Sequence, residues 1–172
     1  MAIDQTTLSR INQLHPALVT EVKDLYLNKI VPALTGGVSC RFAYTMRTFE
    51  QQNELYAQGR TTLFDRQGKR LGIVTNAKGG QSFHNYGLAL DIVLIDNVSA
   101  YWNVVKDFDG DAVPDWMEIV RIFKENGWEW GGDWTSFKDL PHFQKTFGYT
   151  CEQLLEKYNQ KDFIPGSYFV NI

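Results

Sequence analysis

The chain has 172 residues, about the length of one ordinary domain, and 44% of them are hydrophobic and 14% aromatic. This composition supplies a packed core and excludes a largely disordered protein. The 17 basic and 20 acidic residues give a formal net charge of -3 without a basic cluster, which argues against nucleic acid as a partner.

In the first half of the chain, hydrophobic periodicity and turn residues predict helices and strands joined by one long loop. They predict a helix at 16–34, a strand at 38–45, a helix at 48–58, a loop at 59–80 and a short strand within it at 71–75. Thr48 is placed to cap its helix and Gly59 to end it. Arg47 is therefore expected at a junction between a strand and a helix.

The second half is expected to contain a buried strand at 88–95, a helix at 115–126, a short strand at 142–145 and a last helix at 150–158. Asp91 is the one polar residue within the apolar strand. The aromatic stretch with Trp128, Trp130 and Trp134 is expected to lie in the core, with a ligand groove as the alternative. Cys40 and Cys151 are interpreted as packing residues and not as a disulfide.

The organisation of the sequence predicts a single domain over residues 1–172 that acts as a monomer. The sequence shows no internal repeat, low-complexity segment or linker. No run of about 18 apolar residues could span a bilayer, and the first ten residues lack a secretory pattern. We therefore expect synthesis in the cytoplasm.

Two of the three histidines occur beside acidic residues at short spacing, His84 before Asp91 and His142 after Asp139. A buried carboxylate in an apolar strand must be paired, protonated or bound to a metal. A catalytic zinc takes about three protein ligands and leaves a position for water. His84, Asp91 and His142 are the candidate ligands, and Asp139 is the candidate general base. The alternative is that the histidines are ordinary surface or core residues and the aspartates cap loops.

These residues also carry a family resemblance. The segment SFHNYGLALD at 82–91, followed by DLPH at 139–142, resembles the S-x-H-x-x-G-x-A-x-D and (D/E)-x-x-H signatures of the M15 zinc peptidases. Within that family, the chain most resembles the L-alanyl-D-glutamate peptidases that serve as phage endolysins, over most of residues 6–150. The resemblance implies an α+β fold with a small antiparallel sheet and flanking helices, like the Hedgehog and D-Ala-D-Ala peptidase domains.

The resemblance implies a role for each residue of the site. His84, Asp91 and His142 would bind zinc, Asp139 would activate water and protonate the leaving amine, and Arg47 would polarise the scissile carbonyl. A guanidinium in a water-poor site can stabilise an oxyanion by about 3 kcal/mol. The alternative for Arg47 is a surface ion pair.

Two further positions bear on the substrate. Ser82 matches a family position that contacts substrate, although a serine here can equally be a turn residue. Family members that trim terminal D-alanyl-D-alanine usually carry Glu where this chain has Asp139. The shorter acid favours the endopeptidase branch.

An acidic segment at 107–118 has the ligand spacing of a calcium loop. Its carboxylates occupy loop positions 1, 3, 5, 9 and 12: Asp107, Asp109, Asp111, Asp115 and Glu118. Position 6, normally glycine, is Ala112, and no periodic helix precedes the loop. Calcium would order this loop and regulate the enzyme, whereas the alternative is a solvated acidic turn before the helix at 115–126.

The expected function is a zinc metallopeptidase that hydrolyses the L-alanyl-D-glutamate bond of peptidoglycan stem peptides. As a phage endolysin, it would be made in the host cytoplasm and act on the cell wall once the membrane is permeabilised, without a separate wall-binding domain. One alternative is a D-alanyl-D-alanine carboxypeptidase or dipeptidase of the same fold. Another is a zinc-stabilised binding module without turnover.

Overall fold

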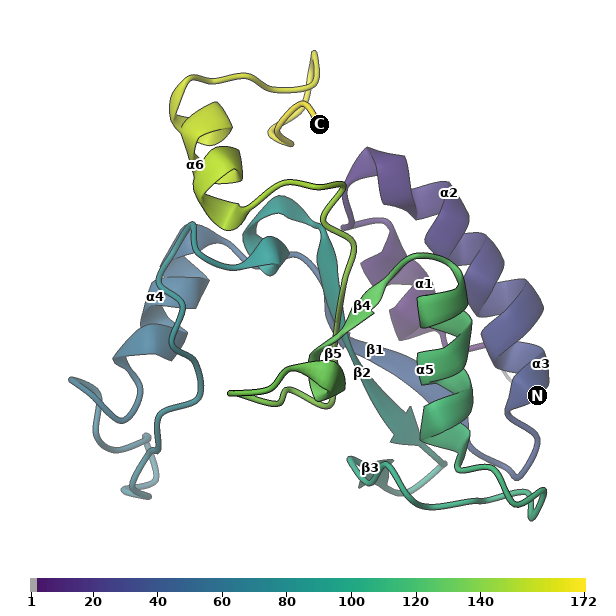
Figure 1. The fold of residues 1–172 in the computed structure, drawn as a ribbon. Coiled ribbons are helices and arrows are strands. Elements are labelled where there is room, and N and C mark those ends of the chain that lie inside the picture. The colour runs from purple at the N-terminus through teal and green to yellow at the C-terminus, as the bar shows by residue number, and fades with distance from the viewer. Residues whose placement is uncertain (1–2) are drawn as a thin grey trace.

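An antiparallel sheet lies at the centre of the computed structural model, which describes residues 3–172 (Figure 1). The strand order is β1-β2-β5-β4, and β3 pairs with β2 outside this path. The strands are β1 (Ser39–Tyr44), β2 (Ala89–Ile95), β3 (Ala100–Tyr101), β4 (Glu129–Trp130) and β5 (His142–Gln144). All four pairings are antiparallel.

The helices lie on both sides of this sheet. In Figure 1, α1, α2, α3 and α5 lie to one side of the strands, and α4 and α6 lie to the other. The helical segments are α1 (Gln5–Ile11), α2 (Pro16–Leu25), the π-helical turn η1 (Tyr26–Ile30), α3 (Val31–Ala33), α4 (Phe49–Ala57), the 3-10 turn η2 (Phe83–Tyr86), α5 (Asp115–Glu125), the 3-10 turn η3 (Gly131–Asp133) and α6 (Cys151–Asn159).

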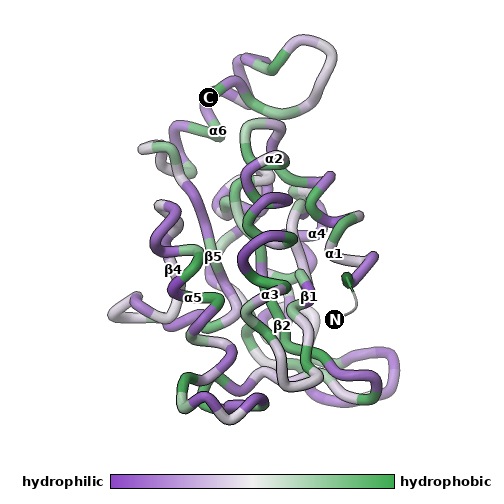
Figure 2. The backbone as a smooth tube through the Cα atoms, turned by 90° about the vertical axis from the view of Figure 1, so that its right-hand side faces the viewer, coloured by the Kyte–Doolittle hydropathy of each residue, from purple (hydrophilic) through white to green (hydrophobic). Residues whose placement is uncertain are grey.

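The core fills the side of the sheet that α2 and α5 cover. Alternate residues of β2, Leu90, Ile92 and Leu94, are fully buried there. Phe123 of α5 packs against Phe143 of β5, with ring centroids 4.7 Å apart. Figure 2 shows α2 with hydrophobic and hydrophilic residues interspersed along it. Each such buried side chain contributes about 1.5–3 kcal/mol to the stability of the fold. Because side chains alternate along a strand, Asp91 faces the opposite side of the sheet.

The structure confirms the α+β fold and most predicted elements. The helix predicted at 16–34 corresponds to α2, η1 and α3, although its π-helical turn was not predicted. Thr48 caps α4 in a capping box with Gln51. The strands at 38–45, 88–95 and 142–145 and the helices at 115–126 and 150–158 correspond to β1, β2, β5, α5 and α6.

One predicted strand is wrong, and three short elements were missed. Residues 71–75 are not a strand; instead, Phe64 bridges Arg70 in a turn, and Ile73 and Val74 remain half-exposed. Apolar residues without a partner strand do not form a sheet. The elements α1, β3 and β4 were not predicted, and the two strands have only two residues each.

Cys40 and Cys151 are free thiols, as predicted, and Cys40 is buried. Burial raises the pKa of Cys151 to about 11, so its thiol stays protonated at neutral pH. Across residues 3–172, none of the helices combines the length and hydrophobicity that a membrane span requires.

Candidate active site

Strand register places Asp91 beside His142. The two residues are direct partners where β2 pairs with β5. On the other edge of β2, Asp91 lies opposite Tyr44, immediately after an irregularity between Phe42 and Tyr44 in β1. Such bulges re-aim side chains and are common beside active sites. The sheet therefore brings together two residues that are 51 positions apart in sequence.

His84 reaches the same point from the 3-10 turn η2. Gly87 ends this turn at φ 69°, and a β-carbon there would lie 2.6 Å from the backbone nitrogen of His15. The motif thus requires glycine for both its backbone conformation and its close packing. His84 Nδ1 donates to the Thr45 carbonyl at 2.6 Å, which leaves Nε2 free to face Asp91.

A hydrogen-bond chain fixes the orientation of the His142 ring. Its Nε2 donates to Gln144 Oε1 at 3.0 Å, and Gln144 Nε2 donates to Glu129 Oε2 at 2.8 Å. This chain directs Nδ1 of His142 toward Asp91 and His84. Partners of this kind set the tautomer of a metal-binding histidine and raise its basicity.

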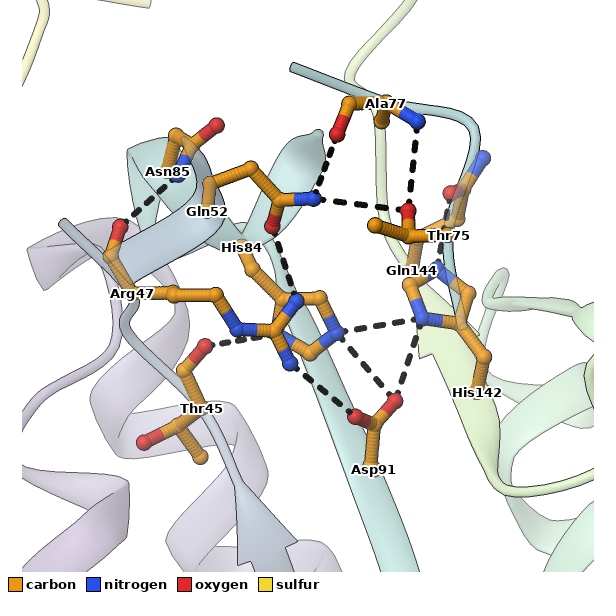
Figure 3. A network of polar contacts seen from close by, with 10 residues as sticks. All are labelled: Thr45, Arg47, Gln52, Thr75, Ala77, His84, Asn85, Asp91, His142 and Gln144. Carbon is orange, nitrogen blue, oxygen red and sulfur yellow. Dashed lines mark hydrogen bonds and ion pairs between the residues drawn. The ribbon is translucent and has the colours of Figure 1, made fainter. Parts of the chain in front are cut away.

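Three donor atoms form an equilateral triangle at this point (Figure 3). His84 Nε2, Asp91 Oδ1 and His142 Nδ1 lie 3.2 Å from one another on every edge. In a tetrahedral zinc site with bonds of about 2.0 Å, ligand atoms are about 3.3 Å apart. The donor set therefore fits a metal ion of zinc's size and preferred geometry.

The site concentrates opposite charges. Burial alone would raise the pKa of Asp91, but His84 and His142 together hold it well below the ordinary range. Arg47 adds a cation, with Nη2 3.6 Å from Asp91 Oδ2. Asp91 therefore remains ionised, as a metal ligand must.

Protonation of His142 makes the metal site sensitive to pH. Burial lowers the pKa of His142, but its contacts with Asp91 outweigh this effect and raise the pKa above its ordinary value. In the metal-free protein, protonated His142 therefore stabilises the fold at low pH, and this stabilisation is lost as pH rises through the raised pKa. Metal binding requires the deprotonated ring and so strengthens with pH.

We accordingly expect the unfolding midpoints of the metal-free and the metal-bound protein to change in opposite directions between about pH 6 and 8. The unfolding midpoint of the metal-free protein should fall relative to that of the His142→Gln variant, whereas the midpoint of the metal-bound protein should rise. Thermal unfolding across this range, with zinc content measured in parallel, tests both. Parallel trends in the two forms would contradict the assigned role of His142.

Arg47 is held at the mouth of the site by four contacts (Figure 3). Its backbone N–H donates to the His84 carbonyl at 3.0 Å, and its carbonyl accepts from Asn85 Nδ2 at 2.9 Å. Its Nη1 donates to Gln52 Oε1 at 2.9 Å, beside the ion pair with Asp91. The Arg47 side chain is only 15% exposed, and its guanidinium is oriented toward the donor triangle, unlike an ordinary surface ion pair.

Gln52 connects Arg47 to the long loop. It is fully buried on α4, and its Nε2 donates to the Ala77 carbonyl at 2.8 Å. The Gln52→Leu variant should lose about 1–3 kcal/mol of unfolding free energy, because buried polar partners are left unpaired. It should also lower turnover while retaining full metal content, because Arg47 is no longer held.

Chemical denaturation, metal analysis and kinetics measure these effects. Glu54→Gln on the exposed face of the same helix is the matched control and should change none of them. Unchanged turnover in a folded Gln52→Leu protein would contradict the positioning role.

Asp139 lines the same cavity as Arg47 and the donor triangle. Its backbone N–H donates to Gly131, where a β-carbon would lie 2.4 Å from the Asp139 carbonyl. Trp130 Nε1 donates to the Leu140 carbonyl at 2.7 Å and anchors the same loop. Burial and the charge of Asp91 raise the pKa of Asp139, although the histidines and Arg47 partly offset them. A raised pKa makes the ionised carboxylate a stronger proton acceptor.

A cavity of about 570 Å³ connects these groups. Arg47, Ser82, Asp139 and the donor triangle all line it, together with Trp134, Phe137 and residues 74–77 of the long loop. This volume suits a small peptide fragment. The structure thus brings Ser82 to the cavity wall, where it is available to substrate.

The tryptophans divide between the two predicted roles. Trp128 and Trp130 are buried in the core. Trp134 lines the cavity and lies against the His142 ring, with centroids 5.2 Å apart. Only the last of the three is therefore placed to contact a ligand.

The structure also brings part of the acidic segment together. Asp107, Asp109 and Asp115 offer oxygens within 4.8 Å of one another, whereas Asp111 and Glu118 lie outside this group. None of the five lines the cavity. The segment is therefore separate from the donor triangle.

Gln52, Gln144 and Trp134 are site residues that the sequence reasoning missed or left open. Gln144 follows His142 by two positions in one strand, so the two side chains share a face. That spacing could have identified it. For Gln52, the only sequence signal was its place in the helix after Arg47.

The fold and the site define the class of this protein: an α+β domain with a His/Asp/His donor set that could hold a metal ion on one side of an antiparallel sheet. A family model described as D-alanyl-D-alanine carboxypeptidase, of the M15 peptidases, matches residues 75–145, which contain all three donors. Over this segment, the chain is similar to the M15 peptidases.

Two curated relatives carry more specific names. The peptidoglycan L-alanyl-D-glutamate endopeptidase CwlK of Bacillus subtilis is 43% identical over 113 residues, 65% of this chain and 64% of the relative. The L-alanyl-D-glutamate peptidase of Listeria phage A118 is 36% identical over 64 residues, 37% of this chain and 21% of the relative. The matches thus span less than two thirds of either relative.

A solved structure supports the fold. The L-Ala D-Glu endopeptidase ChiX of Serratia marcescens superposes with a TM-score of 0.51 at 23% sequence identity. The match covers 86% of this chain and 91% of ChiX. At this level of identity, the likeness concerns the fold alone.

Proposed function

We propose that this protein is a zinc metallopeptidase that hydrolyses the L-alanyl-D-glutamate bond of peptidoglycan stem peptides. The observation that carries the proposal is the donor triangle of His84, Asp91 and His142, which shares one cavity with Arg47 and Asp139. Three protein donors beside an open cavity are typical of a catalytic zinc site, whereas structural sites use four.

A bound zinc ion would polarise water and the substrate carbonyl. The remaining chemistry belongs to the side chains. Asp139 Oδ accepts a proton from the attacking water, for which its raised pKa makes it an effective base. The same carboxyl then returns the proton to the leaving amine, so one residue serves both steps.

Arg47 stabilises the developing charge on the carbonyl oxygen. Its guanidinium is already oriented by Gln52 and Asp91, so little reorganisation is needed during the reaction. Trp134 and Phe137 form an aromatic part of the wall of the same cavity.

The choice of bond rests on the relatives and on Asp139. Both curated relatives are named for the L-alanyl-D-glutamate bond. The family model is named for D-alanyl-D-alanine carboxypeptidases, which makes that activity the second candidate. Aspartate at position 139, in place of the glutamate usual in that branch, favours the endopeptidase.

Mass spectrometry of digested peptidoglycan separates these candidates. An L-alanyl-D-glutamate endopeptidase releases stem peptides that begin with D-glutamate and leaves L-alanine on the glycan. Release of free D-alanine would instead establish the carboxypeptidase. Binding to peptidoglycan without any released fragment would identify a non-catalytic module.

The role as a phage endolysin is a further part of the proposal. The relative from Listeria phage A118 supports it, and the one from Bacillus subtilis supports a bacterial wall enzyme instead. Protein made in the bacterial cytoplasm should lyse the host only when a pore-forming partner opens the membrane. Lysis that does not depend on such a partner would contradict this role.

A further inference from the structure

The segment between β3 and α5 folds around the carboxylate of Asp107. Its Oδ1 accepts from the Gly110 backbone at 2.7 Å, and its Oδ2 accepts from the Ala112 backbone at 3.0 Å. Ala112 adopts φ 74° at the position where calcium loops normally carry glycine. The backbone thus follows the course that the loop spacing predicts, despite the alanine.

The turn before β1 holds this segment in place. Thr35 Oγ1 donates to Asp109 Oδ2 at 2.6 Å. Gly36 packs so closely that a β-carbon there would lie 2.3 Å from the Phe108 backbone. The acidic segment is therefore fixed against the turn before β1, and its carboxylates are gathered by the fold itself.

Two buried carboxylates at the start of α5 each have one oxygen without a hydrogen-bond partner. Asp115 is 0% exposed and Glu118 is 7% exposed. Asp115 Oδ2 accepts from the Phe108 backbone at 2.7 Å, but Asp115 Oδ1 and Glu118 Oε2 have no hydrogen-bond partner. A buried polar oxygen without a hydrogen-bond partner destabilises the fold, and more so when it is charged.

The charge around these oxygens is strongly negative. Burial raises the pKa values of both Asp115 and Glu118, and the nearby carboxylates of Asp109 and the rest of the loop raise them further. Arg121 is a neighbouring cation that acts on Glu118. In the part of the chain from residue 3 onward, none of the five carboxylates forms an ion pair. A cation is the group this arrangement lacks.

We propose that the loop at 107–118 binds one calcium ion, with Asp107, Asp109 and Asp115 as ligands and Glu118 closing the site from the first turn of α5. An all-oxygen carboxylate set suits a hard cation and not zinc or copper. A set of carboxylates suits calcium, which tolerates irregular coordination, better than magnesium, which demands strict octahedral geometry. The site is distinct from the catalytic cavity and stabilises the junction between β3 and α5.

Calcium titration of the zinc-loaded protein tests this site without any measurement of activity. Zinc occupies the donor triangle, so calcium cannot bind there unnoticed. Calorimetry should show one calcium site per chain. At calcium about a hundredfold above the dissociation constant, the unfolding midpoint should rise by about 5–10 °C. Because peptidase activity is not a readout, failure of the proposed function leaves this test unaffected.

Two variants identify the ligands. Glu118→Gln keeps the shape of the side chain but removes its charge, so it should stabilise the calcium-free protein and abolish the calcium-induced shift. Asp109→Ala should abolish calorimetric binding. Glu125→Gln, at the exposed end of the same helix, is the matched control and should retain both the binding and the shift.

Three outcomes would overturn the proposal. The first is the absence of binding heat and of any midpoint shift at about 10 mM calcium, above the weakest range for such loops. The second is a shift that persists unchanged in both Glu118→Gln and Asp109→Ala. The third is an equal response to magnesium, which would exclude the assignment to calcium.

Discussion

The His142→Ala variant is expected to lose both its bound metal and its peptidase activity. His142 Nδ1 supplies one corner of the 3.2 Å donor triangle, and its removal leaves two protein donors. Loss of a hydrogen-bond partner behind a metal ligand typically lowers affinity 10–100-fold, so loss of the ligand itself should exceed about a hundredfold. Asp91 would also lose a partner that keeps it ionised.

Metal analysis after dialysis, together with peptidoglycan hydrolysis, measures these effects. His15→Gln is the matched control, because His15 is the one histidine of the sequence outside the triangle and contacts the Val170 carbonyl. It should retain stoichiometric metal. The metal affinity of Gln144→Ala should lie between those of His142→Ala and His15→Gln, with weakened but detectable binding. Stoichiometric zinc in an active His142→Ala protein would exclude the proposed centre.

The ligand residues could be predicted because their local signals are strong. Asp91 stands out as a single carboxylate in an apolar strand, and buried charge always needs a partner. His84 precedes it at a fixed spacing around Gly87. The helix α4 and its cap at Thr48 were likewise readable from local residues, since capping is a property of adjacent positions.

What the sequence did not reveal depends on long-range contacts. The direct pairing of Asp91 with His142 follows from the register of β2 and β5, which no local pattern states. The hydrogen bond from Gln52 to the Ala77 carbonyl joins residues 25 positions apart and depends on how the long loop folds back onto α4. Residues 71–75 show the converse error, because an apolar pattern predicts a strand only where a partner strand exists.

The acidic segment shows how burial can sharpen a weak motif. The spacing alone left a calcium loop and a solvated turn equally open. A fully solvated turn would expose its carboxylates, yet Asp115 and Glu118 are buried. Their unpartnered oxygens, and not the spacing, carry the inference of a cation site.

The Asp139→Asn variant should separate the base from the ligands. Asparagine keeps the shape of the side chain but cannot accept a proton from water. Metal content and the unfolding midpoint should therefore stay close to those of the parent protein, while turnover falls by about two to four orders of magnitude. Loss of zinc from this variant would show that Asp139 is a ligand.

The pH profile provides a second readout of the same substitution. The raised pKa of Asp139 means that the parent enzyme should lose activity as pH falls through that value, because the protonated carboxyl no longer accepts a proton. The residual activity of Asp139→Asn should not show this acid limb, the loss of activity at low pH. It should follow only the pH dependence of metal binding. If the variant keeps the same acid limb with full zinc content, another group is the base. If the limb disappears together with most of the turnover, the proton passes through Asp139.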